Sequence, residues 1–138
     1  MNEILKFDTH GVGFYEITSD VAQMLSGQGD GLLTLLIRHT SASLLIQENA
    51  DPDVRTDLLA WLDRLAPSAD APQMGWITHR LEGPDDMPAH IKAAVLPTSL
   101  QIPVRAGQML LGRWQGIYLV EHRTRPHRRE VALAFTPT

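Results

Sequence analysis

The segment from His79 to His90 holds the residues of this sequence best suited to bind a metal ion. Asp86 and His90 are four positions apart, so they share one face if the segment is helical, and His79 precedes them across a Gly-Pro turn. Two neutral imidazoles and a carboxylate can ligate zinc, iron or manganese and leave a coordination position open. The alternative is that Asp86 caps the helix and His90 lies on the surface. We expect a functional site here, and a metal ion is one of its two interpretations.

A run of leucines ends at His39, and polar residues follow it in the segment His39–Ser43. Side chains at the end of a buried strand lie where the chain leaves the core, so His39 and Ser41 either cap the strand or line a site. Glu48 and Asn49 come shortly before a helix that Asp51 is placed to cap. Because they lie outside that helix, capping does not account for them. We expect them in the site, with Glu48 a candidate general base.

Two glycines enclose Trp114 and Gln115 between two predicted strands. One interpretation is a β-bulge with a tryptophan packed on the surface. The other is a binding element, in which the ring stacks on a planar or cationic ligand and the amide contacts a ring edge or a phosphate.

Glu121 lies on the same side of a predicted strand as Leu119, among apolar neighbours. A carboxylate in such surroundings requires a partner, and Arg113, Arg123 and Arg129 are the candidates. The arginines between positions 123 and 129 form either a solvated hairpin or a pocket for phosphate or carboxylate. Glu121 and Arg129 are therefore candidates both for an ion pair and for substrate binding.

The composition indicates one globular domain over residues 1–138. The chain is 43% hydrophobic and 20% charged, which is ordinary for a folded domain. A chain of this length buries roughly two-thirds of its unfolded surface. The net charge of −4 argues against a protein that binds nucleic acid or an anionic membrane.

The absence of cysteine excludes disulfides, a thiolate nucleophile and zinc sites with sulfur ligands. No run approaches the length of about 18 apolar residues that a spanning helix needs. Residues 1–8 lack the apolar region of a signal peptide. We therefore expect a cytoplasmic protein.

Strands occupy both ends of the predicted fold, and helices lie between them. Apolar runs and alternating patterns predict strands over residues 3–7, 13–17, 31–38, 43–48, 99–104, 108–112, 115–123 and 130–136. This segregation predicts an α+β fold with a mainly antiparallel sheet and two or three helices.

Each predicted helix has a start signal. Thr18 or Ser19 is placed to cap a short first helix, and Asp85 or Asp86 the last one. The long helix that opens at Asp51 carries a one-sided apolar stripe, made of Val54, Leu58, Trp61, Leu62 and Leu65. In the last helix, the residues predicted to face inward are Ile91, Ala94 and Val95.

Taken together and in this order, these segments resemble the YjbQ family of uncharacterised proteins, which is also labelled secondary thiamine-phosphate synthase. The resemblance extends from about residue 7 to residue 135. The matching stretches are His39–Ser43, Glu48–Val54, His79 with Glu82–His90, Ser99–Val104, Gly112–Gly116, Glu121 and Arg128–Arg129. The chain departs from the family at Arg113, where the family has a threonine. The exchange affects substrate fit only if this position faces the pocket.

The resemblance implies an α+β fold with a β-sandwich-like body, a homotrimer, and a polar site around His39, His79 and His90. It also implies an activity that joins an aminopyrimidine pyrophosphate to a thiazole phosphate and releases pyrophosphate. The word secondary in the label indicates that this can be a side reaction. Because the leaving pyrophosphate must be neutralised, we expect a divalent metal, Mg²⁺ or Zn²⁺, and a small phosphorylated substrate.

Three functional hypotheses follow from the sequence. The first is a transferase that acts on phosphorylated thiamine precursors. The second is a transition-metal hydrolase that uses His79, His90 and one further ligand, for which Asp86 is the candidate, and Glu48 as general base. The third is a ligand-binding trimer without catalytic activity.

Overall fold

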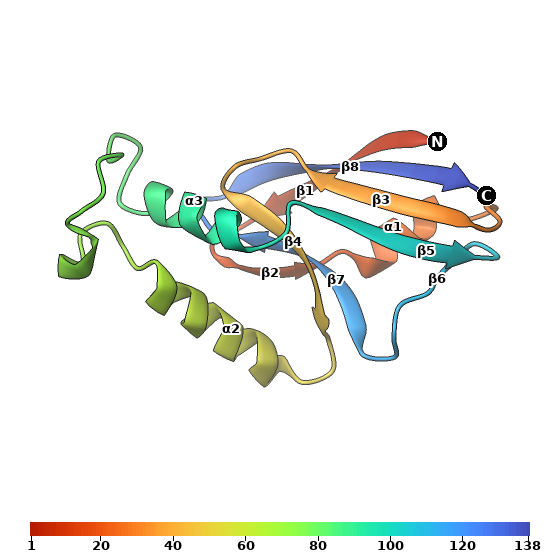
Figure 1. Cartoon of the computed structure of the whole chain (residues 1–138), viewed down its shortest axis with the longest axis horizontal. Helices are drawn as coiled ribbons and strands as arrows, with labels where there is room; N and C mark the ends of the chain where they lie inside the picture. Colours follow the sequence, from red (N-terminus) through yellow and green to blue (C-terminus); the bar gives the residue numbers. More distant parts are fainter.

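The computed structural model describes residues 1–138 and contains strands, three α-helices and one short 3₁₀ helix (Figure 1). The strands are β1 (Asn2–Thr9), β2 (Gly13–Glu16), β3 (Gly31–Ile37), β4 (Ala42–Glu48), β5 (Ser99–Arg105), β6 (Gln108–Met109), β7 (Gln115–Glu121) and β8 (His127–Pro137). The helices are α1 (Thr18–Met24), α2 (Pro52–Leu65), α3 (Asp86–Val95) and the 3₁₀ helix η1 (Pro72–Met74). No helix combines the length and the apolar character that a membrane crossing requires.

The strands form two antiparallel sheets, which confirms the predicted α+β class. The five-stranded sheet has the order β1-β8-β3-β5-β6, and the three-stranded sheet has the order β2-β7-β4. The apolar run of β3 predicted a central strand, and β3 indeed lies between β8 and β5. In the smaller sheet, Ala42 pairs with Glu121 and Glu48 pairs with Gln115, so the start of β4 lies at the end of β7.

The main core lies between the two sheets. β3, β5 and β8 contribute Leu33, Leu35, Ile102, Val131 and Leu133, and the smaller sheet contributes Leu44, Ile117 and Leu119. Strand β7 alternates as its sequence predicts, because Ile117 and Leu119 face this core whereas Tyr118 and Val120 face away from it.

Helix α2 covers the outer face of the smaller sheet (Figure 1). Its Leu62 packs against Tyr118 and Val120. The predicted apolar stripe is only partly covered within the chain, since Trp61 is 50% exposed and Leu65 is 42% exposed. The helix begins as expected, with Asp51 accepting a hydrogen bond from the backbone N–H of Asp53.

The predicted inner face of α3 is wrong for Ala94 and Val95, which are exposed, whereas the half-buried Ile91 packs against a small apolar cluster as expected. The buried residues of α3 are Asp86, Pro88, Ala89, Lys92 and Ala93. The helix turns a partly polar face toward the protein because Asp86 finds partners there. The prediction used only the apolar pattern and so did not include a buried polar contact.

The predicted side-chain caps of α1 and α3 are also wrong. Ile17 precedes α1, and the Thr18 hydroxyl instead donates to Glu16 and accepts from the backbone N–H of Ile117. Asp85 precedes α3 without capping it, because its carboxylate is occupied by Arg123 and Thr124.

Candidate functional site

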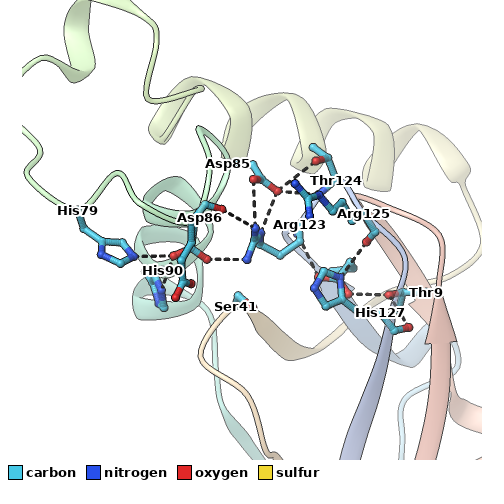
Figure 2. Close-up of polar contacts among 12 residues, drawn as sticks. Thr9, Ser41, His79, Asp85, Asp86, His90, Arg123, Thr124, Arg125 and His127 are labelled. Carbon is cyan, nitrogen blue, oxygen red and sulfur yellow. Dashed lines mark hydrogen bonds and ion pairs between the residues drawn. The ribbon is translucent and has the colours of Figure 1, made fainter.

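Three side chains converge at the start of α3, as the sequence predicts (Figure 2). The Nε2 atoms of His79 and His90 lie 2.7 Å and 3.2 Å from the same oxygen, Oδ2 of Asp86. The carboxylate is buried, whereas the His79 and His90 side chains are 42% and 33% exposed. We call these three residues the His–Asp–His triad. Solvent reaches the triad from the side of the two imidazoles, whereas its carboxylate is covered by the protein.

The donor atoms of the triad suit a divalent metal ion. The three atoms lie within 4.8 Å of one another. Atoms that ligate one ion at about 2.0–2.2 Å lie roughly 3–4.4 Å apart, so a small movement of the imidazoles about Asp86 would bring all three to one ion. Two imidazoles and one carboxylate are the donors that suit zinc, iron or manganese rather than magnesium. Of the two metals expected from the sequence, Zn²⁺ fits this donor set.

An ion-pair network holds Asp86 in place (Figure 2). Arg123 donates from Nη1 to Asp86 Oδ1 at 2.7 Å and from Nε to Asp85 Oδ2 at 2.9 Å. The backbone N–H and hydroxyl of Thr124 also donate to Asp85, and Arg123 reaches the backbone oxygen of Glu82. The network connects the end of β7 to the first turn of α3, so it orients the carboxylate that the triad shares.

The network also keeps both carboxylates charged. Burial alone would raise the pKa of Asp86, but the hydrogen bond from His79 and the charges of Arg123 and His90 outweigh it and hold the pKa below its usual value. Burial likewise opposes ionisation of Asp85, and the hydrogen bonds from Arg123 and Thr124 overcome it and lower its pKa to about 2. Asp86 is thus an ionised carboxylate that can accept a hydrogen bond or bind a cation.

His39 lies close to the triad but has a structural role of its own. Its Nε2 accepts the backbone N–H of Glu130 at 2.7 Å, so this nitrogen is unprotonated. Burial and the charge of Arg129 lower the pKa of His39. His39 and His90 nevertheless line one surface pocket of about 250 Å³, together with Thr40 and Thr98. The strand-capping interpretation of His39 therefore holds, and its ring also borders the space beside His90.

Ser41, Glu121 and Arg129 form a second, buried cluster. Arg129 donates to both carboxylate oxygens of Glu121 and to the Ser41 hydroxyl, and the Thr9 hydroxyl donates to Glu121 at 2.6 Å. Arg129 is only 4% exposed. Glu121 therefore forms the ion pair that its buried position required, and its partner is Arg129. The hydrogen bonds of Arg129 come from Nε and Nη2, so substrate binding through its remaining nitrogen, Nη1, stays a prediction.

The remaining predicted residues lie at the other end of the smaller sheet. Glu48 and Gln115 are register partners, and the backbone N–H of Asn49 donates to the backbone oxygen of Trp114. Trp114 is 58% exposed. The seven residues of β4 span roughly 20 Å, so these four residues do not reach the triad within one chain.

Local hydrogen bonds already engage three of these side chains, those of Gln115, Asn49 and Glu48. The Gln115 side chain accepts from the backbone N–H of Gly112, so it stabilises the turn. Asn49 donates to Glu16 at 3.2 Å, and Glu48 accepts from the backbone N–H of Asp51. Arg113, where the chain departs from the family it resembles, is exposed in this turn.

Sequence reasoning missed Arg123 and Thr124 as the residues that support the carboxylates of the triad region. The sequence offers Arg123 only as one of several possible partners of Glu121. The signal that could have found them is the position of Arg123 just after β7, where a strand end delivers a side chain to a site.

Comparison with known proteins identifies the family of the chain. The family model described as UPF0047 protein YjbQ-like matches residues 3–138. The chain belongs to the UPF0047 family. This confirms the resemblance found in the sequence.

Other UPF0047 members resemble the chain over most of its length. A UPF0047 protein from Synechocystis is 48% identical over 131 residues, which cover 94% of this chain and 86% of the relative. The UPF0047 protein YjbQ of Salmonella typhimurium is 48% identical over 114 residues, or 80% of this chain and 79% of the relative.

Solved structures agree with the UPF0047 fold. A conserved hypothetical protein from Thermus thermophilus has a TM-score of 0.84 and 37% identity, covering 97% of this chain and 99% of that one. A hypothetical protein from Aeropyrum pernix has a TM-score of 0.82 at 26% identity, with 99% of both chains covered.

Proposed function

We propose that this UPF0047 protein is a metal-dependent enzyme whose active centre is the His–Asp–His triad. The observation that carries the proposal is the convergence of two histidine Nε2 atoms on one buried carboxylate oxygen, with all three donors within 4.8 Å. Arg123 orients Asp86 from the side away from the histidines, as residues behind a metal ligand commonly do. The exposed imidazole side leaves room for a substrate oxygen.

A divalent metal held by the triad would supply positive charge to an oxyanion or a leaving group. The protein residues would do the rest. Asp86 holds its charge because Arg123 pairs with its second oxygen, and His79 and His90 are each oriented by Asp86. The pocket shared by His39 and His90 would receive the part of the substrate that does not touch the metal.

The substrate class that we propose is a small phosphorylated molecule. The reaction is a transferase step like that of secondary thiamine-phosphate synthases. An aminopyrimidine loses pyrophosphate from its methylene carbon, and the ring nitrogen of a thiazole phosphate forms the new carbon–nitrogen bond. Such a step needs neutralisation of the departing pyrophosphate rather than a strong nucleophile, and a cationic centre with open access meets this need. The activity can be a side reaction of the site.

One observation favours a metal-dependent hydrolase as the second candidate. Arg123 and Arg129 are both paired with carboxylates of the chain. This reduces the positive charge that they offer to two phosphorylated substrates, whereas hydrolysis of one ester or amide needs only the metal and a base. Glu48 could act as that base only from a neighbouring subunit, because it lies at the far end of β4 in its own chain.

We also propose that the protein assembles as a homotrimer in which neighbouring subunits complete the site. The Trp114 end of one subunit would then meet the triad of the next, which would unite the residues that one chain keeps apart. Uncovered apolar side chains support an assembly of this kind. Trp114 is 58% exposed, Trp61 50% and Leu36 46%.

The test is a thiamine-phosphate formation assay with both precursors and added Zn²⁺, Mn²⁺ or Mg²⁺. We expect product with the wild-type protein, loss of product after chelation, and recovery on adding metal. His90→Ala should lower the rate by about 10²–10³. His10→Ala, an exposed histidine between β1 and β2, is the matched control and should retain the full rate.

The other outcomes separate the candidates. Product that survives His90→Ala would contradict the triad as the active centre. Bound metal without product, together with ester or amide hydrolysis that His90→Ala abolishes, would favour the hydrolase. A tightly bound small molecule without any turnover would favour a ligand-binding trimer.

A further inference from the structure

A second pocket, of about 260 Å³, lies between α2, α3 and the segment that follows β7. Helix α3 presents it and the triad on different faces. Asp86 and His90 are four positions apart and face the triad, whereas Pro88 and Lys92 are four positions apart and line this pocket. Leu59 and Leu62 of α2 form its apolar wall.

Lys92 is the unusual residue of this pocket. It is 7% exposed, yet its ammonium makes no hydrogen bond or ion pair with another residue of the chain. A buried charge without a partner costs considerable free energy. The Tyr118 hydroxyl is the only side-chain polar atom that is both fully enclosed and unpartnered. Since the Lys92 nitrogen is unpartnered as well, it is not fully enclosed, and solvent reaches it from the pocket that Lys92 lines.

No other polar group of the pocket contacts the Lys92 ammonium. Asp85 is already bonded to Arg123 and Thr124. His122 contacts Ser43 through Nε2 at 2.8 Å, and burial together with the charge of Lys92 lowers its pKa to about 4, so it is uncharged. Asp63 of α2 also lines the pocket. Burial lowers the pKa of Lys92, and the charges of Asp63 and Asp85 oppose this shift, but neither carboxylate forms an ion pair with the ammonium. The pocket thus holds one buried ammonium without a contacting partner beside an apolar wall.

We propose that this pocket binds a small monocarboxylate, whose carboxylate pairs with Lys92 and whose apolar body packs against Leu59 and Leu62. A single negative charge matches the single ammonium. A phosphate dianion would be repelled by Asp63 and Asp85 more strongly than a monocarboxylate, because it carries twice the charge. The volume is below that of pockets for drug-sized ligands, so the ligand is a short acid.

The experiment measures binding of isovalerate to the full-length protein by calorimetry, with isovaleramide as the neutral probe of the same shape. We expect isovalerate to bind and the amide not to bind. Lys92→Met, which keeps the length of the side chain, should weaken binding by about 30-fold or more. Lys6→Met removes the only other lysine and should leave the affinity unchanged.

Two further variants make the test specific. Asp63→Asn removes the competing carboxylate at the pocket, so it should tighten isovalerate binding several-fold. His90→Ala should leave the binding unchanged, which separates this pocket from the triad. Equal binding of amide and acid, or full affinity in Lys92→Met, would overturn the proposal. Loss of binding in His90→Ala would likewise overturn it, since the acid would then lie at the triad.

A second measurement needs no variant at all. The wild-type protein is treated with an acetylating reagent, and the modification of its two lysines is mapped by mass spectrometry. We expect isovalerate to protect Lys92 and not Lys6. Equal acetylation of Lys92 with and without isovalerate would contradict the proposal even if Lys92→Met fails to fold.

Discussion

Glu121 and Arg129 form the most deeply buried ion pair of the chain, with side chains 0% and 4% exposed. Thr9 and the backbone N–H of Arg123 add further hydrogen bonds to the carboxylate. Burial alone would raise the pKa of Glu121, but the bonds from Arg129 and Thr9 outweigh it and keep the pKa below its usual value. The pair therefore joins β1, β7 and β8 beside the candidate site.

Removing one member of this pair should damage the fold more than removing both. Arg129→Met leaves the buried carboxylate without its cation and should lower the free energy of unfolding by about 3–5 kcal/mol. The double variant Glu121→Gln/Arg129→Met should recover much of this loss. Urea unfolding at pH 7 measures both. A loss below about 1 kcal/mol in Arg129→Met would contradict the structural role assigned to the pair.

His122 is a buried histidine that the fold keeps neutral. It is 1% exposed, and burial and the charge of Lys92 lower its pKa from 6.5 to about 4. Between these two values the unfolded chain binds a proton that the folded chain does not. The contribution of neutral His122 to the free energy of unfolding is therefore fully present above pH 6.5, and it is lost as the pH falls toward 4.

His122→Gln should remove this pH dependence while keeping a polar partner for Ser43. From pH 7 to pH 5, the wild-type protein should lose about 2 kcal/mol of unfolding free energy that the variant does not lose. Urea unfolding at the two pH values gives the difference. Parallel losses in the two proteins would show that His122 titrates normally in the folded state.

At the scale of the elements, the helix starts differ in how they are held. Asp51 caps α2 through the backbone N–H of Asp53 at 2.9 Å. Helix α1 has no side-chain cap, because the main core holds its Val21 and the following Leu25. The start of α2 is therefore set by local chemistry, whereas the start of α1 depends on tertiary packing.

Asp51→Ala should therefore lower the free energy of unfolding by about 1 kcal/mol. Ser19→Ala, at the second residue of α1, is the matched control and should change it by less than about 0.5 kcal/mol. Thermal or urea unfolding checks both. An equal effect of the two substitutions would contradict the cap assignment.

This contrast explains what could be predicted from the sequence. The strands, the long helix and the buried alternation of β7 follow from periodicity, which is a local property. The inner face of α3 does not, because it is set by the bonds of Asp86 to Arg123, and these residues are far apart in the chain. An apolar pattern therefore pointed to Ala94 and Val95 where the fold buries Lys92 and Ala93.

At the scale of the whole molecule, the candidate site is divided. The triad could be predicted because its members lie within twelve positions, His79 to His90. The place of Trp114 and Glu48 could not, since it depends on the direction of β4 and β7 in the smaller sheet. These strands carry the two groups to opposite ends, and in the homotrimer that we propose a second subunit would bring them together.

Subunit mixing tests the shared site. His90→Ala and Trp114→Ala should each lose the thiamine-phosphate activity alone. When the two variants are co-expressed, random assembly should restore roughly a quarter of the sites, because each site takes the triad from one subunit and Trp114 from its neighbour. No recovery in assembled mixed trimers would contradict a site shared between subunits.

Metal binding tests the central proposal most directly. Calorimetric titration of the chelator-treated wild-type protein with Zn²⁺ should show one ion bound per chain. The double variant His79→Ala/His90→Ala should lose this binding, whereas His10→Ala/His127→Ala, which removes two histidines outside the triad, should keep it. Absence of binding in the wild-type protein, or equal binding by both double variants, would contradict the triad as a metal centre.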